Sequence, residues 1–478
     1  MCGVLGICGF EDVSSELVNG LISIQHRGQD AAGILTYSDG RFNMHKGTGY
    51  VSQAFRKVDI SKLAGNVGLG HVRYATVGST EAIDAQPFAV NYPYGIAMVH
   101  NGNVINFVKL RKVLNDNFHR MVETSNDVEL LLYTFATYLQ EKNLAHIGIE
   151  DLYETVEFVQ ETVKGAYSCI TYIKGKGFLA FTDPYGIRPL MMGKKVTERG
   201  TKYIFTSETC VFDYLGYDYV RDLEAGEAVF IDMDNKLHSK ILKRKKPSFC
   251  VFEYIYFARE DSVFRHRLVA SERVRMGKAL KERLEEAKIE PDIIIDVPNS
   301  AYFFASGLAE EINVPYRRGL AKNRFVGRSF ITPNAELRKR VVRQKLNPIR
   351  DIIEGKKIAV VDDSIVRGTT SRHIVHMLKE FGAKEVYFVS ASPPVKYPCI
   401  YGIDMSVKKE LIAANCTVEE IAESLGCEKV VYQTLEGLRE LYKDLPICDA
   451  CFSGDYPTGI TQEILDEIES EKLKSDRV

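Results

Sequence analysis

Apolar and polar positions alternate in two different ways along this chain. In the first part, short apolar runs at residues 2–10, 95–98 and 167–172 have the length and composition of strands. Residues 126–139 instead carry apolar side chains at intervals of three and four, which predicts a helix with Ser125 or Asn126 as its N-cap. We therefore expect the first part to consist of short strands with a few helices.

The second part alternates between strand and helix patterns. Apolar runs predict strands at 293–295, 358–361 and 386–389, and charged amphipathic stretches predict helices at 272–287 and 370–381. This alternation is typical of a parallel sheet, which binds ligands at the carboxyl ends of its strands. The second part is thus expected to be a separate α/β domain.

A polar and basic stretch at residues 234–247 separates the two patterns and is the best candidate for a domain boundary. We predict a first domain over 2–235, a second over 250–445, and a C-terminal segment over 446–478. That segment contains a CxxC pair and ends in a charged amphipathic helix.

The composition is that of a globular protein with no preference for polyanions. The 478 residues include 62 Lys and Arg and 64 Asp and Glu, a formal net charge of −2, so no nucleic-acid or membrane partner is expected. The apolar runs fall far short of the ~20 residues of a membrane-spanning helix. The N-terminus lacks the basic flank of a secretory signal. We expect a cytoplasmic, multidomain enzyme.

The ten cysteines are expected to be free thiols rather than disulfides, because nothing in the sequence directs the chain to an oxidising compartment. Four of them could form one metal centre: Cys250, Cys399, Cys448 and Cys451. The CxxC spacing lets the last two sulfurs reach the same centre. Four thiolates suit either structural Zn²⁺ or a [4Fe–4S] cluster, and spacing alone does not choose between them.

Cys2 becomes the N-terminal residue once the initiator methionine is removed. Its α-amino group, with a pKa of about 8, could then act as general base beside its own thiol. One residue would supply both nucleophile and base. Taken alone, a cysteine in second position is more often incidental.

Several segments downstream change that interpretation. MCGVLGI, HRGQDAAGI (26–34), GHVRYATVG (70–78), HNGN (100–103) and TSND (124–127) together resemble the glutamine amidotransferase domain of the N-terminal-nucleophile hydrolases. The resemblance implies a four-layer αββα sandwich with Cys2 as the catalytic nucleophile. It also implies an oxyanion hole from Asn101 and the N–H of Gly102, and substrate anchors for glutamine at Arg73, Asp127 and Arg27, the last orienting the Cys2 terminus.

A second motif, KKIAVVDDSIVRGTTS (356–371), consists of an apolar strand, two carboxylates and a small-residue loop that opens a helix. Backbone N–H groups at a helix N-terminus make a site for a phosphate group. The motif resembles the phosphoribosyl pyrophosphate (PRPP) loop of type I phosphoribosyltransferases, which implies a parallel-sheet α/β domain. The residues that it implies for PRPP binding are Asp362, Asp363, Arg367, Gly368, Thr369, Thr370 and Ser371.

Two further segments fit the same site. DVPNSA (296–301) resembles the loop that receives pyrophosphate, and it implies Ser300 as a ligand of Mg²⁺ beside the two aspartates. The basic segment 322–347 would on its own also suit a nucleic acid. It resembles the flexible loop that closes over PRPP, with Lys322 and Arg324 in PRPP binding.

Taken together, the motifs resemble the glutamine PRPP amidotransferase family, in its iron–sulfur branch, which favours [4Fe–4S] over Zn²⁺. The resemblance implies transfer of ammonia from glutamine to C1 of PRPP, giving 5-phosphoribosylamine, glutamate and pyrophosphate, the first committed step of purine biosynthesis. It also implies a homotetramer inhibited by purine nucleotides. Other glutamine amidotransferases would share only the first part, and a PRPP-sensing regulator without catalysis would not need Cys2 and its glutamine anchors.

Overall fold

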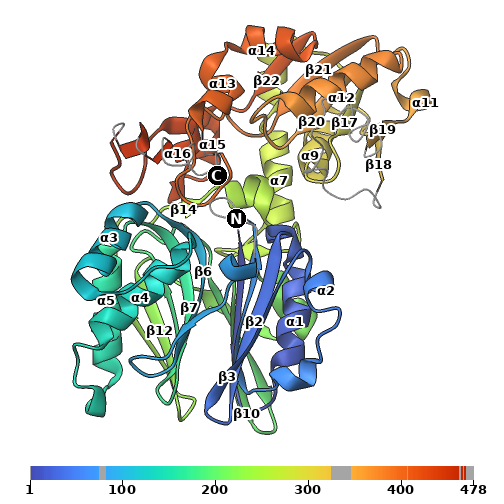
Figure 1. The fold of residues 1–478 in the computed structure, drawn as a ribbon. Helices are drawn as coiled ribbons and strands as arrows, with labels where there is room; N and C mark the ends of the chain where they lie inside the picture. Colours follow the sequence, from blue (N-terminus) through green and yellow to red (C-terminus); the bar gives the residue numbers. More distant parts are fainter. Residues whose placement is uncertain are drawn as a thin grey trace.

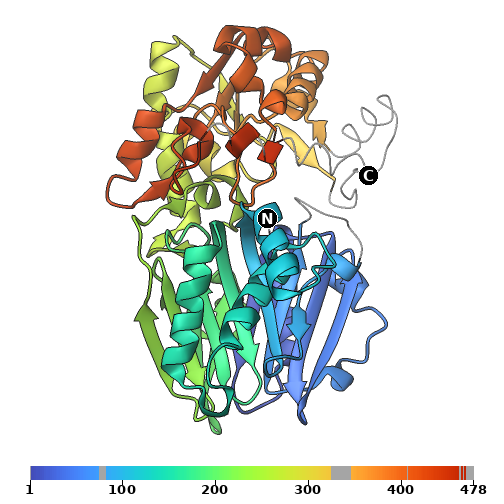
Figure 2. The same ribbon diagram turned by 60° about the vertical axis from the view of Figure 1, so that its left-hand side comes forward.

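Two lobes of different architecture form the molecule, and the N-terminus lies at their junction (Figures 1 and 2). The computed structural model describes residues 2–74, 82–323, 346–405, 407–461, 464–466 and 468–469. The lower lobe in Figure 1 is built from the first part of the chain and the upper lobe from the rest.

The lower lobe contains two antiparallel sheets. In the first the order is β11 (Asp218–Asp222), β9 (Met191–Thr197), β10 (Gly200–Thr206), β1 (Gly3–Cys8), β4 (Val67–Arg73), β2 (Ala31–Ser38) and β3 (Arg41–Thr48). In the second it is β13 (Leu237–Ile241), β12 (Glu227–Asp232), β8 (Gly177–Thr182), β7 (Gly165–Ile173), β6 (Ile96–Val104) and β5 (Phe88–Val90). The sheets pack face to face through apolar side chains such as Val4, Val99 and Ile170.

Helices cover the outer face of each sheet. The first sheet is covered by α1 (Ser14–Ser23), α2 (Val51–Ala54) and α6 (Cys210–Leu215), and the second by α3 (Phe107–Phe118), α4 (Asp127–Leu139) and α5 (Ile149–Thr162). The four-layer αββα sandwich expected from the sequence is therefore confirmed. Helix α4 begins after Asn126, whose Oδ1 accepts a hydrogen bond from Val128 N–H (3.2 Å).

The upper lobe is built on a parallel sheet in the order β17 (Ile293–Asp296), β20 (Lys357–Asp362), β21 (Glu385–Ser390) and β22 (Lys429–Tyr432). Its larger helices are α7 (Val269–Lys278), α9 (Tyr302–Ile312), α12 (Thr369–Glu380), α14 (Val418–Leu425) and α15 (Leu435–Leu441). Shorter ones are α8 (Lys281–Glu286), α11 (Arg350–Ile353), α13 (Ile412–Asn415) and α16 (Ala450–Ser453). The predicted α/β domain is confirmed.

Small sheets complete the upper lobe. Strand β14 (Phe249–Cys250) pairs in parallel with β23 (Ile447–Cys448), β15 (Val263–Phe264) forms a hairpin with β16 (Arg267–Leu268), and β18 (Leu320–Lys322) pairs with β19 (Leu346–Pro348). In the part of the chain that the structure describes, no helix has both the length and the apolar character needed to cross a bilayer.

Two local features differ from the sequence prediction. The polar boundary segment contains β13, which pairs with β12 and extends the second sheet to Ile241. The single helix predicted at 272–287 is two helices, α7 and α8, and α7 starts earlier, at Val269. Helix α7 is constrained by its crossing with α9, where a Cβ on Gly277 would lie 2.1 Å from the carbonyl oxygen of Phe304.

The chain passes from one lobe to the other along a turn organised by Asp183. Its buried carboxylate accepts hydrogen bonds from the N–H groups of Tyr185 (2.8 Å), Ile187 (3.2 Å) and Tyr167 (3.2 Å). The carbonyls of Tyr185 and Ile187 then accept from the N–H groups of Ser248 (2.8 Å) and Cys250 (3.2 Å). This turn fixes the start of the upper lobe on the lower one.

Candidate active site

Cys2 immediately precedes β1 (Gly3–Cys8), and Figure 1 marks the N-terminus where the sandwich faces the upper lobe. Its side chain is partly exposed, and its nitrogen lies 3.4 Å from Oδ1 of Asn101. The sulfur lies 3.8 Å from the carbonyl oxygen of Tyr74, and Nε of Arg27 donates to the Cys2 carbonyl (3.1 Å). The first sheet thus presents the thiol and the backbone nitrogen of Cys2 next to a residue of the second sheet.

Asn101 and Gly102 stand on β6, opposite Ser168 and Tyr167 of β7. The Nδ2 of Asn101 is buried and has no hydrogen-bond partner among the described residues. A buried donor of this kind costs free energy unless a ligand satisfies it. At Gly102 φ is +151°, and a Cβ would lie 1.9 Å from the Ala166 carbonyl oxygen, so only glycine fits this position.

Arg73 and Asp127 lie near this pair. Arg73, at the end of β4, is buried and its guanidinium lies 3.9 Å from the carboxylate of Asp84. Asp127 begins α4, but Asn126 is the cap, so Asp127 does not serve that purpose. It accepts a hydrogen bond from Val104 N–H (2.7 Å), and the helix N-terminus stabilises its charge.

Arg27 is held in a buried ionic network. Its guanidinium donates to Glu208 (2.5 Å) and to both oxygens of Glu253 (2.9 and 3.0 Å), and Arg188 also donates to Glu253. Burial alone would lower the pKa of Arg27, but the charges of Glu253 and Glu208 raise it, so it stays protonated. Glu208 also bonds to His26 (2.7 Å). The pKa of Glu208 would be raised by its burial, but its interactions with His26 and Arg27 lower it.

The second group of polar residues lies at the carboxyl ends of β17 and β20, which are adjacent parallel strands. Asp363 accepts hydrogen bonds from the hydroxyls of Ser364 (2.7 Å) and Ser300, so the two predicted loops meet. Burial and the charge of Asp363 raise the pKa of Asp362 well above its usual range. Burial likewise raises the pKa of Asp363, while the Ser300 hydrogen bond opposes that rise.

The small-residue loop precedes α12 as predicted. Gly368 is the N-cap, with φ +72°, and Thr369, Thr370 and Ser371 form the first turn. Arg367 pairs with Glu410 (2.6 Å). The first turn of this twelve-residue helix follows the Asp362–Asp363 pair along one loop, and the N–H groups of such a turn are of the kind that bind anions.

Lys322 ends β18, and its partner β19 begins at Leu346. The two strands are therefore the base of the predicted basic loop. The loop itself, including Arg324, lies outside the described residues.

The four candidate metal-binding cysteines lie close together. Cys250 and Cys448 are register partners in the β14–β23 pair, and Cys451 O accepts from Tyr397 N–H (3.1 Å), two residues before Cys399. Burial raises the pKa of the Cys451 thiol, and the neighbouring charges of Cys399, Cys250 and Cys448 raise it further. Among the described residues, however, no group of three or more His, Cys, Asp or Glu side chains is arranged to hold a metal ion.

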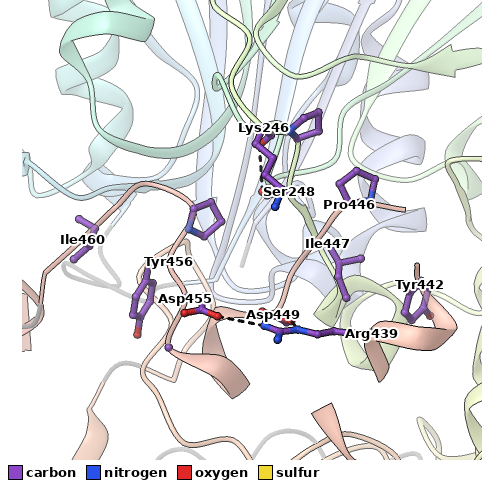
Figure 3. A pocket seen from close by; sticks show the side chains of 13 residues that line it. Lys246, Ser248, Arg439, Tyr442, Pro446, Ile447, Asp449, Asp455, Tyr456 and Ile460 are labelled. Carbon is purple, nitrogen blue, oxygen red and sulfur yellow. Dashed lines mark hydrogen bonds and ion pairs between the residues drawn. The ribbon is translucent and has the colours of Figure 1, made fainter. Parts of the chain in front are cut away.

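A cavity of about 750 Å³ borders the CxxC turn (Figure 3). Asp449, between Cys448 and Cys451, pairs there with Arg439 (2.7 Å), and Arg439 also reaches Asp455 (3.3 Å). This cavity is separate from both groups of site residues, and its ion pairs fix the turn that carries two of the thiols.

The segment carrying Cys399 also touches the Cys2 site. Asn103 donates to the Ile400 carbonyl (2.9 Å), a Cβ on Gly402 would lie 3.0 Å from the Gly102 carbonyl oxygen, and Tyr74 donates to Asp404 (3.3 Å). One wall of the first site is therefore supplied by the upper lobe.

Sequence reasoning missed several residues that organise these sites: Gln86, Arg188, Glu208, Glu253 and Asp296. Gln86 accepts from His100 N–H (2.7 Å) beside Asn101. Asp296 ends β17, and its charge helps to raise the pKa of Asp362. A signal existed for Glu253, which stands alone in the apolar run CVFEYIYF, because an acidic residue in such a run is buried only when it is paired.

Comparison with known proteins agrees with this arrangement. Residues 71–213 match the model of a glutamine amidotransferase domain, and residues 271–415 match that of a phosphoribosyl transferase domain. The fold and sites thus define an amidotransferase joined to a phosphoribosyltransferase.

Full-length relatives identify the family. The amidophosphoribosyltransferases of Pasteurella multocida and Saccharomyces cerevisiae are 42% and 44% identical to this chain; each alignment covers 99% of it and 96% and 95% of the relative. A glutamine PRPP amidotransferase from B. subtilis, solved in complex with ADP and GMP, superposes with a TM-score of 0.86 at 38% identity and covers 97% of this chain and 98% of its own. The chain belongs to the amidophosphoribosyltransferase family and is an enzyme.

Proposed function

We propose that this enzyme uses Cys2 to release ammonia from glutamine and delivers it to PRPP in the upper lobe. The observation that carries the proposal is the contact of the Cys2 nitrogen with Asn101, whose buried Nδ2 has no partner among the described residues. The Cys2 thiolate would attack the carboxamide carbon, and the C–N bond would break to give ammonia and a glutamyl thioester. Water would then release glutamate and restore the thiol.

The remaining residues of this site would bind glutamine and stabilise the developing charge. Asn101 and Gly102 would donate to the oxyanion, and Arg73 would bind the α-carboxylate with two parallel hydrogen bonds. Asp127 would hold the α-ammonium group. Arg27 would orient the Cys2 terminus through the hydrogen bond to its carbonyl.

In the upper lobe, the loop 367–371 would bind the 5-phosphate of PRPP, and Asp362 and Asp363 the ribose hydroxyls. Ammonia attacks C1 as the bond from C1 to the pyrophosphate oxygen breaks, and the aspartate charges favour the cationic sugar of the transition state. Mg²⁺, when bound, neutralises charge on the pyrophosphate. Ser300 and the two aspartates would hold it, and few protein ligands are needed because substrate phosphates supply most of its oxygens.

Ammonia has to reach C1 without being protonated by water. The contacts of segment 400–404 with Asn103, Gly102 and Tyr74 bring the upper lobe against the first site, which favours direct transfer between the lobes. Lys322 is at the base of the loop proposed to close over PRPP, and Arg324 belongs to that loop. Closure by PRPP should therefore stimulate glutamine cleavage.

The four buried cysteines are proposed to hold a structural [4Fe–4S] cluster. In a cluster each sulfur binds a different iron, so the sulfurs lie farther apart than around one tetrahedral Zn²⁺. The pKa of the Cys451 thiol is raised by burial and further by the charges of Cys399, Cys250 and Cys448, which supports one shared centre, and the resemblance to the iron–sulfur branch favours the cluster. Purine nucleotides are proposed as feedback inhibitors, since a similar enzyme is known in complex with ADP and GMP. We also propose that the enzyme is a homotetramer and that it is located in the cytoplasm.

The direct test is release of glutamate from glutamine with and without PRPP and Mg²⁺, while pyrophosphate is followed in the same reaction. We expect strong stimulation by PRPP and equal amounts of the two products. Cys2→Ser should abolish the glutamine-dependent reaction and retain synthesis from added ammonia, whereas Cys416→Ser, at another partly exposed cysteine, should change neither. Glutamine-dependent activity in Cys2→Ser would contradict the proposal.

The cluster is tested separately by iron, sulfide and zinc analysis of anaerobically purified enzyme. We expect a brown protein with bound iron and sulfide, and loss of both in Cys448→Ser but not in the buried Cys427→Ser control. A colourless enzyme with one zinc per chain would replace the cluster by a zinc site.

A further inference from the structure

Arg27 is positioned by two carboxylates that come from different lobes. Glu208 follows β10 in the lower lobe, whereas Glu253 begins a short helical turn (Glu253–Phe257) at the start of the upper lobe. The side chains of Arg27, Glu208 and Glu253 are completely buried. Glu253 forms the two-pronged contact, at 2.9 and 3.0 Å, while Glu208 bonds to a single guanidinium nitrogen.

This geometry fixes the direction of the remaining donor. A guanidinium group is planar, so a carboxylate that holds Nη1 and Nη2 sets the plane and the rotation of the whole group. The Nε–H of Arg27 then points at the carbonyl of Cys2 (3.1 Å). Rotation of the guanidinium would move that hydrogen bond and with it the terminal residue.

The balance of charges is a second reason why Glu253 should hold Arg27 in its present orientation. The network contains two guanidinium groups, Arg27 and Arg188, and two carboxylates, Glu208 and Glu253, all buried. Loss of the charge on Glu253 would leave Arg27 paired with Glu208, and Arg188 would lose its ion pair with Glu253. Arg27 would then be drawn toward Glu208, away from its present plane.

We infer that Glu253 is a positioning residue for the glutaminase nucleophile: through Arg27, a residue of the upper lobe sets the orientation of Cys2. The inference rests on the proposed role of Cys2. Glu253 lies three residues after Cys250, and Cys250 pairs with Cys448 of the CxxC strand. The same short segment therefore contacts both the cluster of four cysteines and, through Arg27, the Cys2 nucleophile. Its contribution should appear in the rate of thiol attack and not in the affinity for glutamine, since Arg73 and Asp127 are untouched.

The test compares Glu253→Gln with Glu227→Gln. Glu227 makes a two-pronged contact of the same kind, to Arg221 (2.8 and 2.6 Å), but this pair is partly exposed and lies on β11 and β12, which adjoin neither β1 nor β6. It therefore reports the cost of losing such a pair away from Cys2. For Glu253→Gln we expect kcat of glutamine hydrolysis and the rate of Cys2 alkylation by iodoacetamide to fall about a hundredfold, the loss that follows a small displacement of a reacting group. KM for glutamine, bound iron and ammonia-dependent synthesis should stay near wild type, and Glu227→Gln should change none of these.

Two further variants keep the inference falsifiable if Glu253→Gln folds poorly. Glu253→Asp keeps the charge and should retain much more activity than Glu253→Gln, whereas Arg27→Lys, which loses the planar fork, should show the same fall in kcat. Wild-type kcat in folded Glu253→Gln would overturn the inference, as would equal losses of iron and of ammonia-dependent synthesis. Failure of the proposed function is distinguishable, because Cys2→Ser would then keep glutamine hydrolysis whatever Glu253 does.

Discussion

The Oδ1 of Asn101 lies 3.4 Å from the nitrogen of Cys2. The Nδ2 of the same amide therefore points away from that nitrogen, and this buried donor has no hydrogen-bond partner among the described residues. One side chain thus touches the proposed base and carries a donor for the oxyanion. Asn101→Ala should lower kcat of glutamine hydrolysis by about 10²–10³, the usual cost of one oxyanion donor, with little change in glutamine affinity. Steady-state kinetics with glutamine and with ammonia would separate these effects. Equal loss in both reactions would mean that Asn101 serves structure instead.

Arg73→Lys should weaken glutamine binding because an ammonium group cannot form two parallel hydrogen bonds to a carboxylate. A charged hydrogen bond contributes about 1.5–3 kcal/mol, so we expect KM for glutamine to rise roughly 10- to 100-fold with a smaller change in kcat. Arg221→Lys, at the two-pronged pair with Glu227, is the matched control and should leave KM unchanged. Unaltered KM in Arg73→Lys would assign Arg73 to its ion pair with Asp84.

Asp362→Asn should reduce both ammonia- and glutamine-dependent synthesis, on the order of a hundredfold, because it removes charge from the proposed ribose site. Since burial and the neighbouring Asp363 raise the pKa of Asp362, ionising it destabilises the empty enzyme at neutral pH. The same variant should therefore unfold at a higher temperature than wild type. Calorimetry without ligands measures this, and Asp234→Asn on the surface should show neither effect.

Burial raises the pKa of the Asp183 carboxyl from its ordinary value of 3.8 to about 6 in the folded protein, so the stability of the protein should depend on pH. The folded state holds this proton more tightly than the unfolded state, so its contribution to stability is complete at low pH and is lost as pH rises from about 4 to about 6. The two pKa values correspond to a loss of about 3 kcal/mol. Relative to wild type, Asp183→Asn should gain stability over that interval and then level off. Denaturant unfolding at pH 4.5 and 7 would test this, and a constant difference would contradict it.

Arg439→Met should make the CxxC turn less rigid, because Arg439 pairs with Asp449 between the two cysteines. The pair is partly exposed, so its contribution is at most about 1 kcal/mol. If the four cysteines hold the proposed cluster, its iron should be lost in air about two- to fivefold faster than from wild type. Arg283→Met, which removes a surface pair with Glu286, is the control. Equal rates would show that the turn is held by other contacts.

Features formed by contiguous residues could be predicted from the sequence, whereas contacts between residues far apart in the chain could not. The strand, the two aspartates, the loop and α12 are contiguous, so their meeting at one sheet end follows from the βα unit alone. The sequence also narrowed the N-cap of α4 to Ser125 or Asn126, and the structure has Asn126. By contrast, Arg27 and Glu253 are 226 positions apart, and no periodicity joins them. Strand β13 was missed because it is an edge strand whose side chains are mostly polar and exposed.

The contacts of residues 400–404 with Gly102, Asn103 and Tyr74 make the first domain depend on the second. If the first domain were expressed as an independent gene product ending after β13, the strand that carries Asn101 and Gly102 would lose a packed wall and become solvent-exposed on that side. Such a fragment would have a complete sandwich but an incomplete catalytic rim. A different partner domain would have to supply a surface of its own at this rim to close the proposed glutamine site.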